Sequence, residues 1–509
     1  TLIDSVQGRL GGAVADCAIC RPPGDPDHAS QRHEDQMKAL AQAMKQAMAE
    51  ARVDGKEICA IGIATTGSTV VPVDKTLQPI DDYYLWCDHR AKGEAEEITG
   101  AARQENLEAI DWCGGVYSPE MAWAKILHWL RRNPEKRARL GTFLDNCDMA
   151  VATLAGVTDS SKVARGVCAA GHKWLWNSKW GGFPSAEFLA KVDPLLAGMR
   201  EKVNGREITS EKAAGALSPK WAQELGLTPG IPIAPGMIDA HADAVAAGIS
   251  IGDLVNVIGT STCVMAVVER GVPIPGITSV AQGSIHPGLV GIEAGLSAAG
   301  DIFEAIARRA GKSVEELSRG LDSFRAGQTG LLRLSWDNGD RNVLSTPHVS
   351  GITFGWSLRH EARDELFAAI EGTAFHTKLI FERLVEYGVP IRRVIHGGGI
   401  PRKNPMLNRV YAGVFKKPVL VPDRPVTGLG SAIFAFLAAG TFKTMEQAQE
   451  ALCPGYETVQ PRAEDSAIYD QLFRIYRELY FAFGKPDSGP VAVGSILPRL
   501  KELRAGGED

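Results

Sequence analysis

The sequence lacks an apolar run long enough to cross a membrane. Its longest, AIFAFLAAG, covers Ala432–Gly440 and is far short of the ~20 residues that span a bilayer. The N-terminus also lacks the basic and then apolar pattern of a signal peptide. We therefore expect a cytoplasmic protein that does not bind a membrane.

Runs of one charge and clusters of cysteine are also missing. Along 509 residues, 55 Lys and Arg alternate with 60 Asp and Glu, for a net charge of -5. Without a basic stripe, nucleic acid is not an expected partner. Nine cysteines are scattered, and only Cys17 and Cys20 form a close pair. No further Cys or His accompanies that pair, so we expect ordinary reduced thiols.

The length exceeds what one hydrophobic core supports, which favours two lobes of roughly 200 to 250 residues. Two distant segments have the same pattern: a helical periodicity over 35–53 precedes an apolar run over 58–64, and another over 364–387 precedes a short apolar run over 393–396. Both runs end in small residues. A helix that leads into such a strand is typical of parallel α/β units, which bind ligands at the carboxyl ends of their strands.

The stretch PGMIDAHADAVAAG, residues 235–248, sets three ionisable side chains among small apolar ones. Asp239 and Asp243 are one helical turn apart, and His241 lies off their shared face. A carboxylate in this setting suits a general base. The alternative, a metal-hydrolase cluster, needs more ligands at metal spacing, and none stands out in the sequence.

The stretch LVNVIGTSTCVMAVVE, residues 254–269, predicts a hairpin. Two β-rich apolar runs flank a turn that offers backbone N–H groups and three hydroxyls. Such a turn can hold a phosphate without a charged side chain. A solvated turn without a function is the alternative.

These stretches belong to a longer series that resembles the FGGY family of sugar kinases, which has the actin and hexokinase fold. The series continues with GLVGIEAGLSAAGDIF, WDNGDR, GITFGWSL, HGGGIPRKNPML and TGLGSAIFA. Within the family, CAAGHKWLWNSKWGGFP, WCDHRAKGEAEEI and GGVYSPEMAWAKILHWL are most similar to ribulokinases. The resemblance implies an α/β fold of two actin-like (ribonuclease H-like) lobes with the active site in the cleft between them. We expect a sugar-binding lobe over 1–249, an ATP-binding lobe over 250–485 and a tail over 486–509.

The resemblance also implies roles for single residues. Asp239 matches the base that takes the proton of the sugar hydroxyl. His241 is left open between a sugar contact and packing, and Asp243 between a structural role and an outer contact to Mg²⁺. The other residues matched to the sugar site are Gly67, Trp86, Asp88, Lys173 and Glu293. Those matched to the ATP site are Gly259, Thr260, Ser261, Thr262, Gly397, Gly398, Gly399 and Asn404.

The implied activity is phosphorylation of a 2-ketopentose at its terminal hydroxyl with ATP and Mg²⁺, by a protein expected to form a homodimer. L-ribulose, the sugar of L-arabinose catabolism, is the first candidate; D-ribulose or another pentulose or pentitol is the second. An actin-fold ATP-binding pseudokinase is the alternative from another class.

The sequence departs from the family pattern at its start. Relatives begin with a strand that ends in an Asp-x-Gly-Thr/Ser phosphate loop, whereas the first residues here, TLIDSVQG, resemble the end of the family's second strand. We therefore expect the natural gene to encode an upstream strand of that form. Smaller departures are Ala64, where relatives often have Asp, and Leu296.

Overall fold

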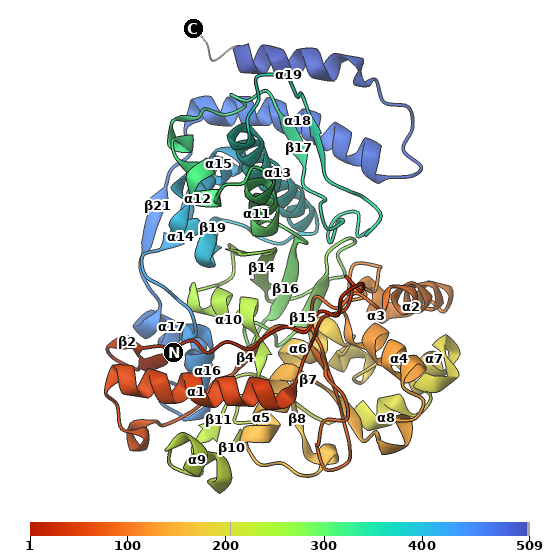
Figure 1. Cartoon of the computed structure of the whole chain (residues 1–509), viewed down its shortest axis with the longest axis vertical. Coiled ribbons are helices and arrows are strands. Elements are labelled where there is room, and N and C mark those ends of the chain that lie inside the picture. Colours follow the sequence, from red (N-terminus) through yellow and green to blue (C-terminus); the bar gives the residue numbers. More distant parts are fainter. Residues whose placement is uncertain (204, 506–509) are drawn as a thin grey trace.

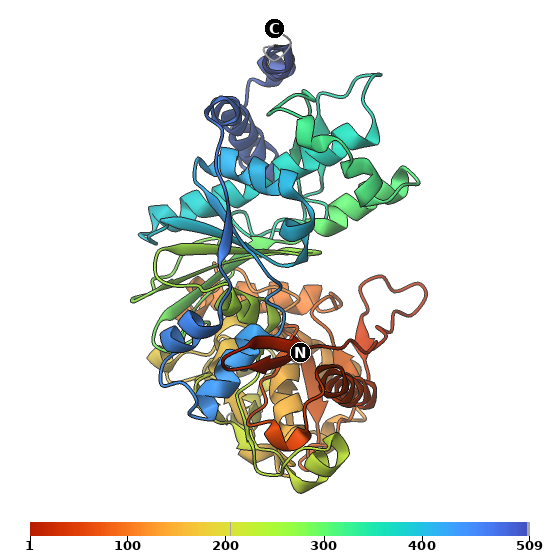
Figure 2. The same ribbon diagram turned by 90° about the vertical axis from the view of Figure 1, so that its left-hand side faces the viewer.

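The computed structural model describes residues 1–203 and 205–505, so the end of the predicted tail, 506–509, lies outside the described residues. The chain forms two halves that are stacked along its long axis (Figure 1). A quarter turn shows the strands of the upper half as a layer directly above the lower half (Figure 2). Within the described ranges, no helix is both long and apolar enough to cross a membrane.

The first 246 residues build most of the lower half from short strands and helices. The strands are β1 (Leu2–Asp4), β2 (Gly8–Gly11), β3 (Ser30–Gln31), β4 (Ala64–Thr65), β5 (Val70–Val73), β6 (Tyr83–Tyr84), β7 (Thr142–Asp145), β8 (Ala164–Gly166), β9 (Arg206–Ile208), β10 (Gly215–Ala216), β11 (Pro232–Ile233) and β12 (Met237–Ile238). The helices are α1 (His33–Ala51), α2 (Lys92–Gln104), α3 (Glu108–Asp111), α4 (Ala122–Arg132), α5 (Asn146–Leu154), α6 (Val167–Lys173), α7 (Ala186–Val192), α8 (Met199–Val203), α9 (Pro219–Leu225) and α10 (Asp239–Ala246).

The chain then builds the upper half. Its strands are β13 (Asp253–Ile258), β14 (Thr262–Val268), β15 (Ser279–Gln282), β16 (Val290–Leu296), β17 (Leu332–Leu334), β18 (Ile352–Phe354), β19 (Arg393–Gly397), β20 (Val419–Pro422) and β21 (Tyr456–Val459). The helices in this part of the sequence are α11 (Gly300–Arg309), α12 (Val314–Ser318), α13 (Ala362–Glu386), α14 (Gly399–Lys403), α15 (Pro405–Phe415), α16 (Leu429–Ala438), α17 (Met445–Leu452), α18 (Ala463–Gly484) and α19 (Ile496–Ala505).

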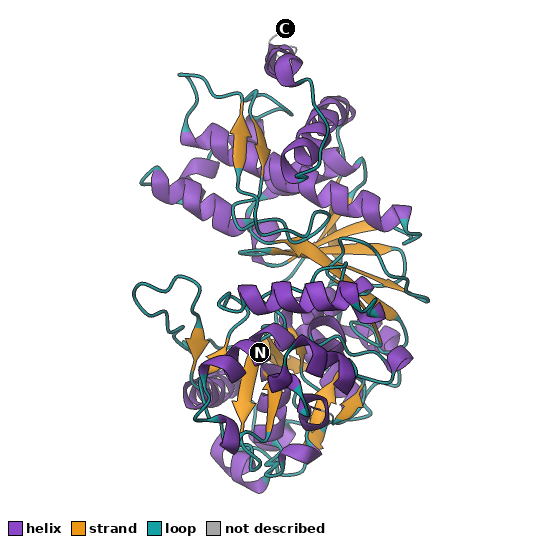
Figure 3. Cartoon of the chain, turned by 90° about the vertical axis from the view of Figure 1, so that its right-hand side faces the viewer, coloured by secondary structure: helices purple, strands orange, loops and turns teal. Residues whose placement is uncertain are grey.

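One seven-stranded sheet organises the upper half, in the order β15-β16-β14-β13-β19-β20-β21. The strands β13, β19 and β20 are parallel, and their neighbours are antiparallel. Most helices of this half lie on the face of the sheet that points away from the lower half (Figure 3). On the other face, α10 of the lower half shares an apolar core with Val255 of β13 and Met265 of β14. The sheet therefore connects the two halves.

The long periodic segments form as the sequence predicts. The segment over 35–53 becomes α1, the segment over 364–387 becomes α13, and the stretch over 254–269 becomes the β13–β14 hairpin, in which Ile258 pairs with Thr262. The predicted strand over 58–64 is largely wrong, because the ladder proper covers only β4. Its neighbour along 232–238 contains Pro232 and Pro235, which cannot donate a hydrogen bond, so the parallel ladder is interrupted.

The lower sheet is divided into separate parts. A four-stranded sheet has the order β3-β6-β5-β7, β4 pairs with β12, and among the described residues β1 and β2 pair only with each other. The helices α16 and α17 return from the upper half to pack against α10, where Gly430 lies so close to Ala242 that a Cβ would be 1.9 Å from its carbonyl oxygen. The chain therefore crosses between the halves again after 250.

Candidate active site

Asp239 begins α10 at the end of β12. Its Oδ1 accepts a hydrogen bond from the backbone N–H of Ala240 at 2.7 Å, and the residue is exposed. A Cβ on Gly67 would lie 2.9 Å from Ile238 Cγ1, so the loop after β4 passes directly beside the start of α10. Burial of the carboxyl group by the surrounding protein raises the pKa of Asp239, while the hydrogen bond from the Ala240 N–H opposes that shift.

Asp243 lies one turn further along α10 and is half-buried. Its carboxylate accepts no hydrogen bond from any residue in the described ranges. Partial burial, together with the charge of Asp239, raises the pKa of Asp243 to about 6. A carboxylate with both oxygens free can contact a hydrated cation, whereas no hydrogen bond of the described residues supports a structural role for it.

Lys173 and Glu293 form an ion pair between the two halves. The Lys173 ammonium at the end of α6 donates to Glu293 Oε1 on β16 at 2.6 Å. The Lys173 side chain is 12% exposed and that of Glu293 is 4% exposed, so the pair is almost shielded from water. Burial alone would raise the pKa of Glu293, but Lys173 and His241 together hold it well below its ordinary value.

His241 holds the other oxygen of the same carboxylate. Its Nε2 lies 3.1 Å from Glu293 Oε2, and its Nδ1 lies 3.1 Å from Cys168 Sγ. The side chain is completely buried, so it offers no free atom to a sugar. The sequence left two roles open for His241, a sugar contact and packing. Neither is sufficient, because both ring nitrogens contact polar groups of the protein.

His172 makes a second connection between the halves. Its Nε2 is hydrogen-bonded to Ser284 Oγ at 2.7 Å, and its Nδ1 is hydrogen-bonded to Ser279 Oγ. Burial and the neighbouring His241 lower the pKa of His172 well below its ordinary value, so the ring is neutral. Only its neighbour Lys173 was matched to the site from sequence. The partners of His172 lie 107 and 112 residues away in the sequence. No local sequence pattern could therefore predict these hydrogen bonds.

The three groups His172, His241 and Glu293 are close enough together to hold a metal ion. Every ring nitrogen already has a protein partner, and the Lys173 ammonium lies against the carboxylate. A divalent cation here would face that positive charge at close range. The arrangement is that of a hydrogen-bonded network.

Asp88 is matched to the sugar site but is fully buried. It accepts from the Ala29 backbone N–H at 3.0 Å and forms an ion pair with Arg90 at 2.7 Å. Trp86, beside it, is half-buried and packs against the core of the lower half. The contacts of Asp88 therefore order this loop, while a sugar contact of Trp86 stays a prediction.

Glu120 and Arg341 also join the two halves. Arg341 Nη2 donates to both carboxylate oxygens of Glu120, at 3.2 and 3.1 Å, and His89 Nε2 lies 3.3 Å from one of them. Burial opposes ionisation of Glu120, but Arg341 overcomes it and lowers the pKa of the carboxyl. Both partners occur in segments that resemble the family, but their pairing had no signal in the sequence.

The β13–β14 turn is held by the start of α11. The Thr260 carbonyl accepts from the N–H groups of Ala299 at 2.9 Å and Asp301 at 3.1 Å, and Gly259 accepts from Gly300 at 3.0 Å. The four turn residues range from exposed at Thr260 to buried at Thr262. In the described chain, Thr262 Oγ1 is buried without a hydrogen-bond partner. An orphaned hydroxyl beside an open turn fits a phosphate oxygen as its missing partner.

The Gly397–Gly399 segment lies next to this turn. Gly398 has φ +84°, and a Cβ there would be 2.5 Å from the Ile258 carbonyl oxygen, so the backbone of β19 approaches the end of β13 closely. Beside Gly399 a Cβ would meet nothing within 4 Å. Asn404 uses its Oδ1 to cap α15 by accepting from Leu407 N–H at 3.1 Å, which leaves its amide nitrogen for a nucleotide.

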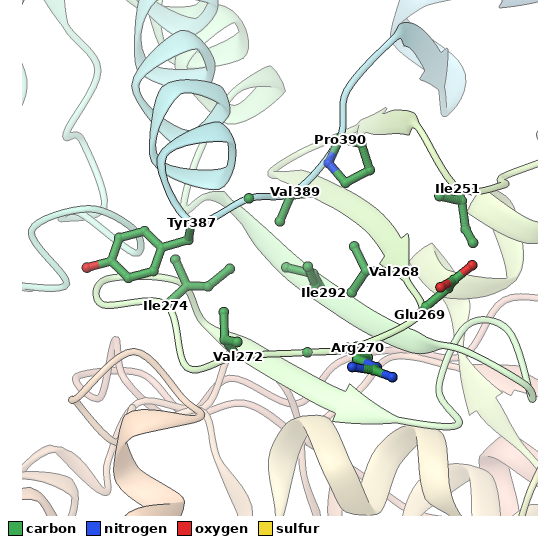
Figure 4. A pocket seen from close by; sticks show the side chains of 12 residues that line it. Ile251, Val268, Glu269, Arg270, Val272, Ile274, Ile292, Tyr387, Val389 and Pro390 are labelled. Carbon is green, nitrogen blue, oxygen red and sulfur yellow. The ribbon is translucent and has the colours of Figure 1, made fainter.

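A hollow of about 360 Å³ lies elsewhere, at the far edge of the upper sheet (Figure 4). Apolar side chains such as Val268, Ile274 and Tyr387 line it. It contains none of the residues matched to the sugar or to ATP. Its position gives it no part in the site described above.

The fold and the site together define a two-lobed kinase of the actin-like class, with its active site in the cleft between the lobes. Solved structures share this fold: a "xyloylose kinase" from Brucella ovis, with a TM-score of 0.82, 21% identity and coverage of 94% of this chain and 96% of that one, and a glycerol kinase from Plasmodium falciparum, with a TM-score of 0.74, 16% identity and coverage of 91% and 92%.

The chain belongs to the FGGY family of carbohydrate kinases, whose N-terminal domain matches residues 3–246 and whose C-terminal domain matches residues 254–439. It is similar to a ribulokinase of Bacillus licheniformis, with 32% identity over 94% of this chain and 90% of the relative. A ribulokinase of Vibrio parahaemolyticus is also 32% identical, over 89% and 88%. The comparisons therefore support a carbohydrate kinase, of a family that uses ATP as its phosphate donor, over the pseudokinase alternative.

Proposed function

We propose that the protein phosphorylates a 2-ketopentose at its terminal hydroxyl, with L-ribulose as the preferred acceptor. The observation that carries the proposal is the Lys173–Glu293 pair, which joins the two halves in segments that resemble ribulokinases. The relatives named ribulokinases support the same choice. An ammonium and a carboxylate side by side suit a polyol, because together they donate to and accept from neighbouring oxygens.

In this mechanism Asp239 takes the proton of the sugar hydroxyl. The hydroxyl oxygen forms a bond to the γ-phosphorus of ATP while the bond to ADP breaks, so that the products are the sugar phosphate and ADP. The exposed position of Asp239, beside the Gly67 loop, supports this role. The missing side chain of Gly67 lets this loop pack against Ile238, directly before Asp239.

The turn over 259–262 and the glycines over 397–399 hold the nucleotide. Backbone N–H groups and the Thr262 hydroxyl contact the phosphates, and the side of the backbone left open at Gly399 lies against the base or ribose. Mg²⁺, when bound, neutralises the charge that develops on the phosphate oxygens. Asp243 is the residue of α10 whose free carboxylate suits an outer contact to that ion.

The test is an ADP-release assay on L-ribulose, D-ribulose, D-xylulose, L-xylulose, ribitol, L-arabinose and glycerol. We expect the highest kcat/KM on L-ribulose, because a site with buried polar partners discriminates sharply against acceptors that leave them unpaired. Equal turnover of glycerol and L-ribulose would contradict the proposal. A higher kcat/KM on D-ribulose would support the same reaction but would make D-ribulose the preferred acceptor. The predicted homodimer is tested separately, by light scattering.

A further inference from the structure

Three buried side chains form a line that ends at the proposed sugar site. Cys168 comes from α6, His241 from α10 and Glu293 from β16. Their exposed fractions are 0%, 0% and 3%. The line ends at Lys173, whose ammonium is the member of the group that solvent still reaches.

The hydrogen bonds along this line hold the His241 ring at both of its nitrogens. Cys168 Sγ lies 3.1 Å from Nδ1, and a thiol that donates there places the ring proton of the neutral imidazole on Nε2. Nε2–H then donates to Glu293 Oε2. The protonated ring donates from Nε2 in the same way, so both charge states hold the carboxylate.

The two carboxylate oxygens of Glu293 have different partners. Oε2 is held by His241, with His172 Nδ1 also near it at 3.5 Å, while Oε1 contacts Lys173. A carboxylate fixed at one oxygen cannot rotate about its last torsion without breaking that bond. Its free lone pairs and the Lys173 ammonium therefore keep one orientation toward the acceptor.

We propose that His241 is a positioning residue for the sugar acceptor, which orients Glu293 through Nε2, and that Cys168 holds the His241 ring for this through Nδ1. The proposal rests on the assignment of Lys173 and Glu293 to the sugar under the proposed function. It gives a role to a buried histidine and a buried cysteine that never touch the substrate.

A purely structural role for His241 predicts something different. A packing role acts through the stability of the fold, so the smaller Asn would disturb the sugar KM and the ATP KM together. Positioning depends on a donor at one place: the Gln amide nitrogen reaches the place of Nε2, whereas the shorter Asn amide reaches only that of Nδ1. The pair His241→Gln and His241→Asn therefore separates the two roles.

The experiment measures kcat and KM for the sugar, and KM for ATP, in the full chain. The sugar is the acceptor that the wild type uses with the highest kcat/KM. We expect His241→Asn to raise the sugar KM by about tenfold or more, the scale of one charge-assisted hydrogen bond, and to leave the ATP KM within about twofold. His241→Gln should stay within about threefold of the wild type.

Cys168 provides an independent comparison. Cys168→Ser keeps a donor to Nδ1 and should retain the sugar KM, whereas Cys168→Ala removes it and should raise that KM by about fivefold. Cys113→Ala is the matched control, because Cys113 is also buried but contacts the Ile110 carbonyl outside this line. It should leave the sugar KM unchanged.

Equal sugar KM values for Gln and Asn at His241 would overturn the proposal, and so would equal values for Ser and Ala at Cys168. If the His241 variants do not fold, the Cys168 pair decides. A wild type that prefers an acceptor other than a ketopentose contradicts the proposed function, and the same variants then test positioning on that acceptor.

Discussion

Two carboxylates one turn apart on α10 differ in what surrounds them. Asp239 is exposed at the start of the helix, whereas Asp243 is half-buried, with no hydrogen bond to its carboxylate from the described residues. The nearby charge of Asp239 helps to raise the pKa of Asp243 to about 6. The exposed position of Asp239 at the helix start supports its proposed role as the base.

We expect Asp239→Asn to lower kcat by about 10²-fold or more, because it removes the base while it keeps the size of the side chain. The sugar KM should change little. Asp243→Asn should cost far less in kcat and should raise the Mg²⁺ concentration needed for half-maximal rate. Steady-state assays with a Mg²⁺ titration measure both effects. Equal losses of kcat in the two variants would move the base away from Asp239.

At the scale of elements, one buried hydroxyl of the β13–β14 hairpin is expected to affect both nucleotide binding and the stability of the free protein. Thr262 Oγ1 is buried and unpaired among the described residues, which costs free energy in the absence of ligand. A group of this kind is retained where a ligand provides its partner. Under the proposed function, we expect this hydroxyl to raise nucleotide affinity while it lowers the stability of the free protein.

Thr262→Val removes this hydroxyl and keeps the shape of the side chain. We expect the ATP KM to rise by about fivefold to tenfold, the sugar KM to stay unchanged, and the free protein to become more stable by about 1 kcal/mol. Kinetics and thermal unfolding without nucleotide check the two effects. Loss of stability together with an unchanged ATP KM would show that the hydroxyl has no phosphate partner.

The helix α13 contains a buried carboxyl group that makes the free energy of unfolding depend on pH. Glu371 is 2% exposed and accepts from Gly327 N–H at 2.9 Å, and burial raises its pKa to about 8. The unfolded chain releases this proton near a pH of about 4. Between these values the folded protein holds the extra proton, so each rise in pH lowers the free energy of unfolding, and the loss is complete above pH about 8.

Glu371→Gln keeps a hydrogen-bonding group of the same shape and removes this titration. We expect little change in the free energy of unfolding at pH 5 and a gain of a few kcal/mol, about 3 to 5, at pH 8. Denaturant unfolding at the two pH values measures it. Glu386→Gln, exposed at the end of the same helix, is the control and should leave the pH dependence of the wild type. A gain that is equal at both pH values would contradict the assignment.

Elements with strong local patterns could be predicted from the sequence. The periodicity of α13 and the two apolar runs of the β13–β14 hairpin were sufficient, because each element's own residues determine it. The strand before β4 was overestimated, since two prolines in its neighbour interrupt the ladder. Pairing between strands depends on the partner, which a single run of residues does not reveal.

The whole molecule is held by contacts that have no local signal. Glu293 meets Lys173 across 120 residues of sequence, and Arg341 meets Glu120 across 221. Candidate residues such as Lys173 were found only through resemblance to a family, and their actual partners appeared only with the fold. The role of His241 stayed open for the same reason: its burial is set by elements on both sides of the cleft.

The Glu120–Arg341 ion pair allows a direct test of whether contacts between the two halves support activity. Arg341 reaches from the segment between β17 and β18 to a carboxylate just before α4, so each partner fixes a loop of its own half against the other. Because the pair is only partly exposed, its interaction is stronger than that of a surface ion pair. We expect Glu120→Gln and Arg341→Gln each to lower kcat/KM for the sugar by about tenfold, and the double variant to lose no more than the worse single one.

The reason is that two groups which act only through each other have nothing further to lose once one is removed. Lys45→Gln with Glu224→Gln, an exposed pair between α1 and α9, is the matched control and should leave kcat/KM unchanged. Steady-state kinetics of the four proteins in each cycle give the coupling. Losses that simply multiply in the Glu120–Arg341 double variant would mean that the two side chains act separately, and that other contacts, such as the α6–β15 contact through His172, align the halves.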